Sequence, residues 1–127
     1  MKAILEKLEN IQFDHSIWMN ELLFAYNEIP HYEKRIVQLV NTSSNEEEKE
    51  QFNNLLNGFI VQKEAVHQLN EQIKNHVISM SHKAHANGEL KSMIDSVHRE
   101  TREKMETFRT VYAELKEKFH RLASLQD

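Results

Sequence analysis

The feature that most constrains this chain is the spacing of its apolar residues, which recur at alternating steps of three and four over three long segments. This spacing places apolar side chains on one face of an α-helix and predicts helices that pack along their whole length. The seam of the first segment consists of Ile4, Leu8, Ile11, His15, Trp18, Leu22, Ala25, Ile29, Tyr32, Ile36 and Leu39. The second consists of Phe52, Leu55, Phe59, Gln62, Val66, Leu69, Ile73, His76 and Met80, and the third of Ile94, His98, Thr101, Met105, Phe108, Tyr112, Leu115, Phe119 and Leu122.

Two interruptions separate these segments. The polar run 41–45 precedes three glutamates, which are favoured in the first turn of a helix, and we expect Ser44 to cap that helix. Asn87 and Gly88 suit a backbone with positive φ at a helix C-terminus, which predicts the second interruption. The predicted helices therefore span roughly 3–41, 46–86 and 89–126.

The pattern predicts one all-α domain over residues 1–127, an antiparallel up-down bundle of three long helices. Short connections cannot carry the chain back along helices of this length, so neighbouring helices must run in opposite directions. With two glycines and one proline, the chain has too few turn-forming residues for a protein of many short strands. Pro30 should kink the first helix, and a break there or near residues 79–81 would give four helices.

The amino-acid composition excludes several kinds of site and partner. The absence of cysteine excludes disulfides, thiolate metal sites and a catalytic thiol, and makes the cytoplasm the expected compartment. The net charge is −4, and lysine and arginine alternate with glutamate along the chain, which argues against nucleic acid as a partner. No apolar run approaches the ~18 residues of a membrane span, so we expect no membrane partner.

Three histidines interrupt the apolar seams. When the chain is folded at its two turns, His76 and His98 fall level, and His15 lies about one turn, or ~6 Å, away. Imidazole is a preferred ligand of zinc, iron and other divalent transition metals, so the pattern predicts a three-histidine metal site. Carboxylates at Asp14, Glu100 or Glu103 could serve as ligands or as acceptors behind the histidines. The alternative is that the histidines are hydrogen-bonded core residues that fix the register of the helices.

Four stretches resemble signature sequences of a family of small, uncharacterised bacterial helical-bundle proteins: Asp14–Trp18, Glu21–Phe24, Asn57–Glu64 and Met105–Phe108. They occur in all three segments, so the resemblance covers most of the chain. The positions that match include His15, Trp18, Gln62, Glu64, His76 and His98. The resemblance implies a helical bundle and brings no activity with it.

The chain also looks like hemerythrin-like bundles, more distantly. In that resemblance His15, His67 with Glu71, and His98 with Glu103 would stand for the histidine and carboxylate ligands of iron. The chain departs from the pattern because His82 and His85 are spaced by three residues instead of four, and because three helices are predicted instead of four.

The sequence is consistent with two functions of different classes. The first is a non-enzymatic bundle that associates with itself or with another protein through apolar residues outside the seams. These residues are Leu5, Ile17, Leu23, Leu56, Ile60, Val111 and Leu125. The second is a metalloprotein, hemerythrin-like or hydrolytic, in which His15, His76 and His98 bind zinc or iron.

Overall fold

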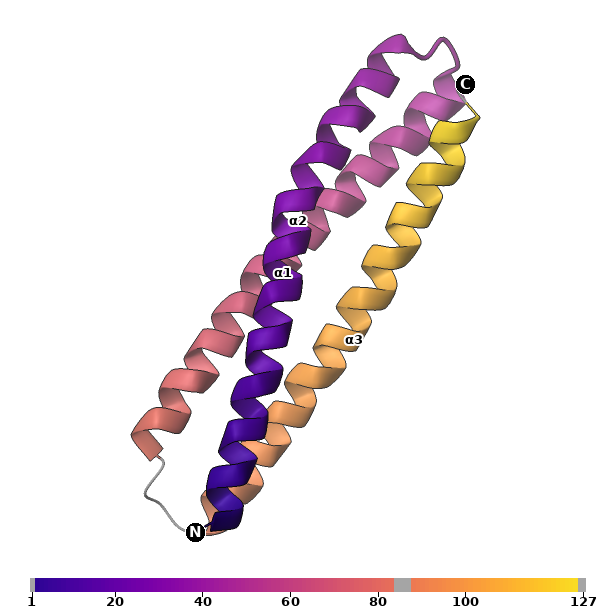
Figure 1. Cartoon of the computed structure of the whole chain (residues 1–127). Coiled ribbons are helices and arrows are strands. Elements are labelled where there is room, and N and C mark those ends of the chain that lie inside the picture. The colour runs from indigo at the N-terminus through magenta and orange to yellow at the C-terminus, as the bar shows by residue number, and fades with distance from the viewer. Residues whose placement is uncertain (1, 84–87, 126–127) are drawn as a thin grey trace.

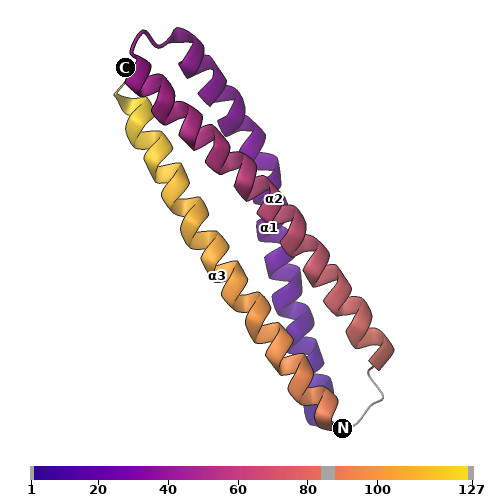
Figure 2. The ribbon, with the colours of Figure 1, turned by 180° about the vertical axis from the view of Figure 1, so that it is seen from behind.

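The computed structural model is a bundle of three long α-helices in up-down order, as the apolar spacing predicts. It describes residues 2–83 and 88–125, and the side chains of residues 5–76 and 94–125. The helices are α1 (Lys2–Thr42), α2 (Glu46–Lys83) and α3 (Gly88–Ser124). Figure 1 shows them lying lengthwise beside one another, with α1 and α3 running in the same direction and α2 in the opposite one. Seen from behind, α2 crosses α1 near mid-length while α3 runs alongside (Figure 2).

Neither of the expected breaks within a helix forms. Pro30 lies within α1, which continues past it as a single, gently curved helix (Figure 1). The Pro30 side chain is exposed, so the hydrogen bond that proline removes is lost on the solvent side, where water replaces it. Residues 79–81 lie inside α2. The bundle therefore has three helices, and the four-helix alternative is wrong.

The cap of α2 is Asn45, and the prediction of Ser44 is wrong. The Asn45 Oδ1 atom accepts hydrogen bonds from the backbone N–H groups of Glu47, at 2.9 Å, and Glu48, at 3.3 Å. Ser44 lies one residue too early to reach these amides. The buried Ser43 supports the turn instead, because its Oγ accepts from the Asn45 N–H and donates to the Glu48 carboxylate.

Gly88 does not end a helix, contrary to the prediction. It is the first residue of α3, and no glycine in the described part of the chain has positive φ. Its partner in the predicted motif, Asn87, lies outside the described residues. A glycine is tolerated at the first helical position because the amides there have no intrahelical partner whatever the side chain.

The seam residues form one continuous core, which contains the buried apolar side chains of all three helices. At the end nearest the α1–α2 connection, the core holds a cluster of aromatic rings. Tyr32 stacks on Phe59 with ring centroids 4.7 Å apart, and Phe119 meets Tyr32 edge-on at 5.0 Å. The Tyr32 hydroxyl forms a hydrogen bond with the Nε2 atom of His120 at a distance of 3.0 Å. We call Tyr32, Phe59, Phe119 and His120 the aromatic layer.

A ladder of ion pairs joins α1 to α3 at seven-residue intervals. In each pair the partners are 88 residues apart in the sequence. The pairs are Lys7 with Asp95, Asp14 with Arg102, Glu21 with Arg109 and Glu28 with Lys116. Because the same separation of 88 residues occurs in all four pairs, the ladder reports one register between the two parallel helices.

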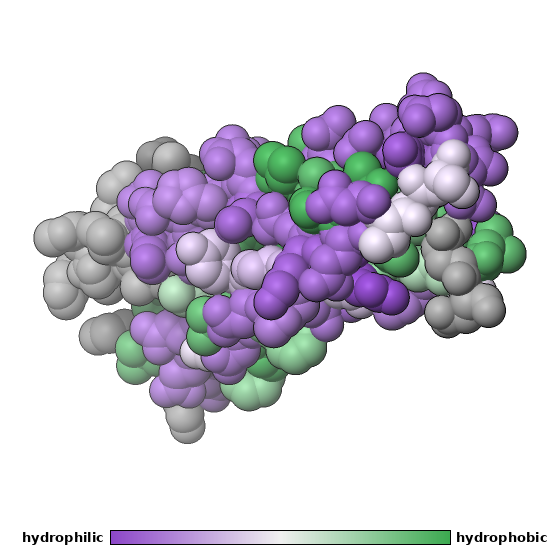
Figure 3. Space-filling view, turned by 90° about the horizontal axis from the view of Figure 1, so that it is seen from above, coloured by the Kyte–Doolittle hydropathy of each residue, from purple (hydrophilic) through white to green (hydrophobic). Residues whose placement is uncertain are grey.

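The side of the molecule seen from above is mainly hydrophilic, with separate hydrophobic patches (Figure 3). In the described part of the chain, no helix has the length and apolar character that crossing a bilayer requires.

Candidate metal centre

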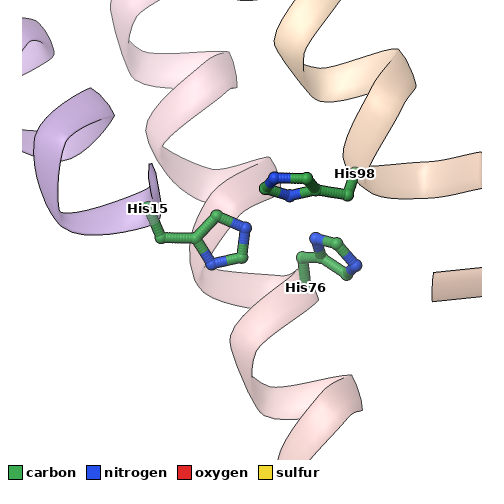
Figure 4. Close-up of side chains that lie close together, drawn as sticks. All are labelled: His15, His76 and His98. Atoms are coloured by element: carbon green, nitrogen blue, oxygen red, sulfur yellow. The ribbon is translucent and has the colours of Figure 1, made fainter. Parts of the chain in front are cut away.

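His15, His76 and His98 meet in the core of the bundle, one from each helix (Figure 4). The centroid of the His15 ring is 5.2 Å from that of His76 and 5.3 Å from that of His98, and the last two are 6.3 Å apart. One nitrogen from each ring lies within 4.8 Å of the other two. The prediction that the three rings converge is confirmed. We call these residues the histidine layer.

The histidine layer is buried and packs against Trp18. His15, His76 and His98 are 2%, 8% and 6% exposed. The buried Trp18 indole stacks on the His98 ring at 4.9 Å and tilts against His15 at 5.7 Å. Trp18 follows His15 by one helical turn, so its ring can reach across to the ring on α3. The imidazoles are therefore held in a poorly solvated site where an unpaired polar atom is costly.

Five of the six ring nitrogens in this layer have no hydrogen-bond partner. They are both nitrogens of His15, both of His76 and the Nδ1 atom of His98. In the described part of the chain, these five are the complete set of buried side-chain nitrogens and oxygens without a partner. Each such atom costs about 1–3 kcal/mol when water is removed from it. The alternative of hydrogen-bonded core histidines agrees with His98, which pairs with Asp14, whereas the rings of His15 and His76 have no such partner in the described residues.

The sixth nitrogen, Nε2 of His98, lies 2.9 Å from the Oδ2 atom of Asp14. A carboxylate can only accept a hydrogen bond, so the His98 imidazole carries a proton on Nε2, and this N–H donates a hydrogen bond to Asp14. The Nδ1 atom then presents a lone pair to the interior. Arg102 binds the same Asp14 oxygen at 3.4 Å and holds the carboxylate in place. A carboxylate behind a histidine in this way fixes the ring orientation and raises its basicity toward a metal.

Burial keeps the rings of His15 and His76 uncharged. Removal from water, together with the neighbouring His76 and His98, lowers the pKa of His15 to about 4 despite the opposing effect of Asp14. Burial and then His98 also lower the pKa of His76. Both rings are therefore neutral at pH 7, and a neutral imidazole is the form that binds a metal ion.

The donor set fits a divalent transition metal. Nitrogen ligands of tetrahedral zinc lie about 2.0–2.1 Å from the metal, which places them roughly 3.4 Å from one another. Small side-chain rotations would bring three nitrogens within 4.8 Å to that spacing. The layer offers three lone pairs from three helices, so one ion would link the whole cross-section of the bundle.

Of the three predicted carboxylates, Asp14 alone lies at this layer. Glu100 is exposed and pairs with Lys104 on its own helix at 3.5 Å. Glu103 is exposed beside a shallow cleft between α2 and α3. His67 and Glu71, which the hemerythrin resemblance pairs as ligands, are exposed on α2 and remote from the three rings. The side chains of His82 and His85 lie outside the described residues.

A cleft of about 570 Å³ between α1 and α3 gives access to one side of the layer. Asp14 and His98 are among its lining residues, together with the cations Lys7, Arg99 and Arg102. Sequence reasoning did not identify Arg102 or the stacked Trp18 as parts of this site. The sequence could have pointed to Arg102 in two ways. Arg102 follows His98 by one helical turn, and it is separated by seven residues from the charged residues Asp95 and Arg109.

No known protein family, curated protein sequence or solved structure matches this chain. The resemblances to bacterial helical bundles and to hemerythrin-like bundles therefore stay predictions, and the functional argument depends on the geometry of the histidine layer.

Proposed function

We propose that this protein binds one divalent transition-metal ion, zinc in preference to iron, through His15, His76 and His98. The single observation that carries the proposal is the set of five unpartnered nitrogens in the core. An ion would occupy one lone pair on each ring and so remove part of a desolvation cost that the apolar core otherwise bears. The hydrogen bond from His98 to Asp14 supports the same function.

The ligand types favour zinc. Three neutral imidazoles suit zinc, copper or nickel, whereas non-haem iron sites generally add one or more carboxylate ligands. Asp14 already accepts hydrogen bonds from His98 and Arg102, and Glu71 and Glu103 are exposed. This distribution of carboxylates speaks against the hemerythrin-like reading.

We propose a stabilising role for the ion in place of a hydrolytic one. A three-histidine zinc ion keeps a fourth position for water or a small ligand, and it can polarise what binds there. A general base would have to come from the same cleft, where Asp14 is held by His98 and Arg102. The ion would instead link all three helices at the end of the bundle opposite the aromatic layer.

Metal analysis of protein purified without a chelator or an affinity tag tests the proposal. We expect about one equivalent of zinc per chain, and its removal by a chelator should lower the melting temperature by roughly 10–20 °C when free zinc had been near a thousandfold above its dissociation constant. Cobalt substitution should give the visible absorption of a tetrahedral nitrogen-ligated ion.

His76→Ala should abolish binding, and His76→Leu should do the same while keeping the core filled. His67→Ala is the matched control, because His67 lies on the same helix and is exposed. Folding of each variant is checked by circular dichroism. A folded wild-type protein that takes up no zinc, cobalt or iron after soaking would refute the proposal, as would full binding by folded His76→Leu.

A further inference from the structure

The outward face of α1 differs from the rest of the surface in having no charged residue over about six turns. Every exposed α1 residue between Glu9 and Lys34 lacks a carboxylate, an ammonium or a guanidinium group. Over the whole chain, 28% of the residues are Asp, Glu, Lys or Arg. By contrast, α3 exposes charged side chains on successive turns from Arg99 to Arg121. We call this face of α1, from Asn10 to His31, the neutral face.

The neutral face also exposes large apolar side chains. Phe13 is 66% exposed, Ile17 41%, Leu23 58%, Phe24 64% and Tyr26 50%. The other members are asparagine, glutamine, serine, proline and histidine residues. These side chains are spread around the solvent-facing side of α1, with Ile17 and Phe24 on the side next to α3. Exposed apolar surface on an uncharged face favours an interaction site there.

The charged residues of this part of α1 all point away from the face. Asp14, Glu21 and Glu28 are half-buried at its edge and pair with cations of α3. Ile17 and Phe24 line a cleft of about 520 Å³ that continues from the face onto α3, beside Tyr112 and Ala113. The carboxylates at the edge of the neutral face are therefore each paired with a cation of α3, and the centre of the face has no charged side chain.

We infer that the neutral face binds a second copy of this chain, with the two α1 helices antiparallel across a two-fold axis. In a two-fold interface the residues near the axis face their own copies, so a charge there would meet a like charge. Two copies of a chain of net charge −4 repel each other, and an uncharged contact surface adds no further repulsion between them. The neutral face offers no charge to a partner of complementary charge, which favours a second copy over such a partner.

The residue order along the face fits this symmetry. Its midpoint falls at Asn20, whose amide can both donate to and accept from the Asn20 amide of the second copy. An antiparallel pairing about this point places Ile17 opposite Leu23 and Phe24 of the second copy, and Phe13 opposite its Asn27. The face is about 32 Å long, and it contributes about a dozen residues where a standard interface has roughly 20–30 a side. The dimer should therefore be weak and should dissociate on dilution through the micromolar range.

Sedimentation velocity over a concentration series tests this inference with charge placed at the axis. Asn20→Asp and Asn20→Lys each put like charges opposite one another, and each should weaken the dimer about tenfold or more. An equimolar mixture of the two variants should recover dimerisation, because opposite charges then meet. Thr110→Asp, at an exposed uncharged position on α3, is the control and should leave the dimer unchanged.

Three results would overturn the inference. They are a monomer at every concentration, a dimer insensitive to both Asn20 variants, and weakening by both variants without recovery in the mixture. Cosedimentation of a monomeric wild-type protein with phosphatidylcholine vesicles, lost in Phe24→Ser, would assign the face to a lipid surface instead. The inference is separate from the metal proposal, because His15 is buried and not part of the neutral face, His76 and His98 lie on the other two helices, and the His76→Leu variant should still dimerise.

Discussion

The histidine layer and the aromatic layer lie toward opposite ends of one bundle and differ in how their polar atoms are satisfied. Rings in both layers have centroids about 5–6 Å apart, the spacing typical of packed aromatic side chains. The Tyr32 hydroxyl in the aromatic layer reaches the His120 ring, whereas five nitrogens of the histidine layer have no partner. Ring packing and one hydrogen bond therefore account for the aromatic layer, whereas ring packing in the histidine layer leaves five buried nitrogens unpaired.

The largest expected effect is on the aromatic layer. Phe59→Ala removes a fully buried ring that contacts Tyr32, and should lower the free energy of unfolding by about 3–5 kcal/mol. Urea denaturation followed by circular dichroism measures it. Ile60→Ala, the exposed neighbour, is the control and should change the free energy by less than about 1 kcal/mol.

In metal-free protein, the substitution His76→Leu should not lower the free energy of unfolding, because it removes two unpaired nitrogens from the core. A loss as large as that of Phe59→Ala would erase the contrast between the layers.

The second prediction concerns the acid sensitivity of the histidine layer in metal-free protein. The pKa of His15 falls from 6.5 to about 4 on folding, so the unfolded chain binds the extra proton between these values. Stability is therefore fully present above pH 6.5 and decreases as the pH falls toward 4, by about 3 kcal/mol from His15. Urea denaturation at a series of pH values measures the slope. His15→Leu should remove most of it, and an unchanged slope in this variant would contradict the assignment.

A smaller effect is expected at Asp14, which lies behind the proposed zinc ligand His98. Asp14→Asn keeps the size of the side chain but weakens the acceptor for His98, and should lower zinc affinity about 10–100-fold. Competition with a chromophoric chelator measures the affinity. Asp95→Asn is a matched control, because Asp95 lines the same cleft and pairs with Lys7 in the same ladder. Equal effects of the two substitutions would show that the charge of the cleft, and not the hydrogen bond to His98, governs binding.

The smallest effect is expected from the ion-pair ladder that runs beside both layers. Glu21 binds Arg109 through two contacts of 2.6 and 2.7 Å, but both side chains are more than one-third exposed. Arg109→Gln should cost less than about 1 kcal/mol, and the loss should shrink further in high salt. Thermal denaturation at low and high salt measures it. A salt-independent loss would show that the ladder stabilises the bundle by packing and not by charge.

Much of this architecture follows from local rules. The seams predict which side chains are buried, and the histidines are the polar exceptions within them. The junction near residues 41–45 was located correctly, but its cap was misassigned by one residue. The hydrogen bonds of a cap depend on the path of a few backbone atoms, and Ser43, Ser44 and Asn45 are equally suitable by residue type.

The pairing between helices was harder to predict. Glu21 and Glu28 recur at seven-residue spacing in the sequence, as do Arg109 and Lys116, but their partners depend on how far α3 is shifted along α1. Small changes in that shift exchange one partner for another, because long charged side chains tolerate several geometries. Tertiary packing of the core fixes the shift, and the ladder then follows.

The sequence by itself determined that this chain forms long helices with one buried seam each and histidines in all three seams, because a period near 3.5 residues is a property of the chain alone. Only the tertiary structure decided how closely the three rings approach, that Asp14 lies behind His98, and that five ring nitrogens have no partner. It also showed that the exposed residues of α1 form a neutral face. These depend on the axial shift and rotation of one helix against another, which are set by packing across the whole core.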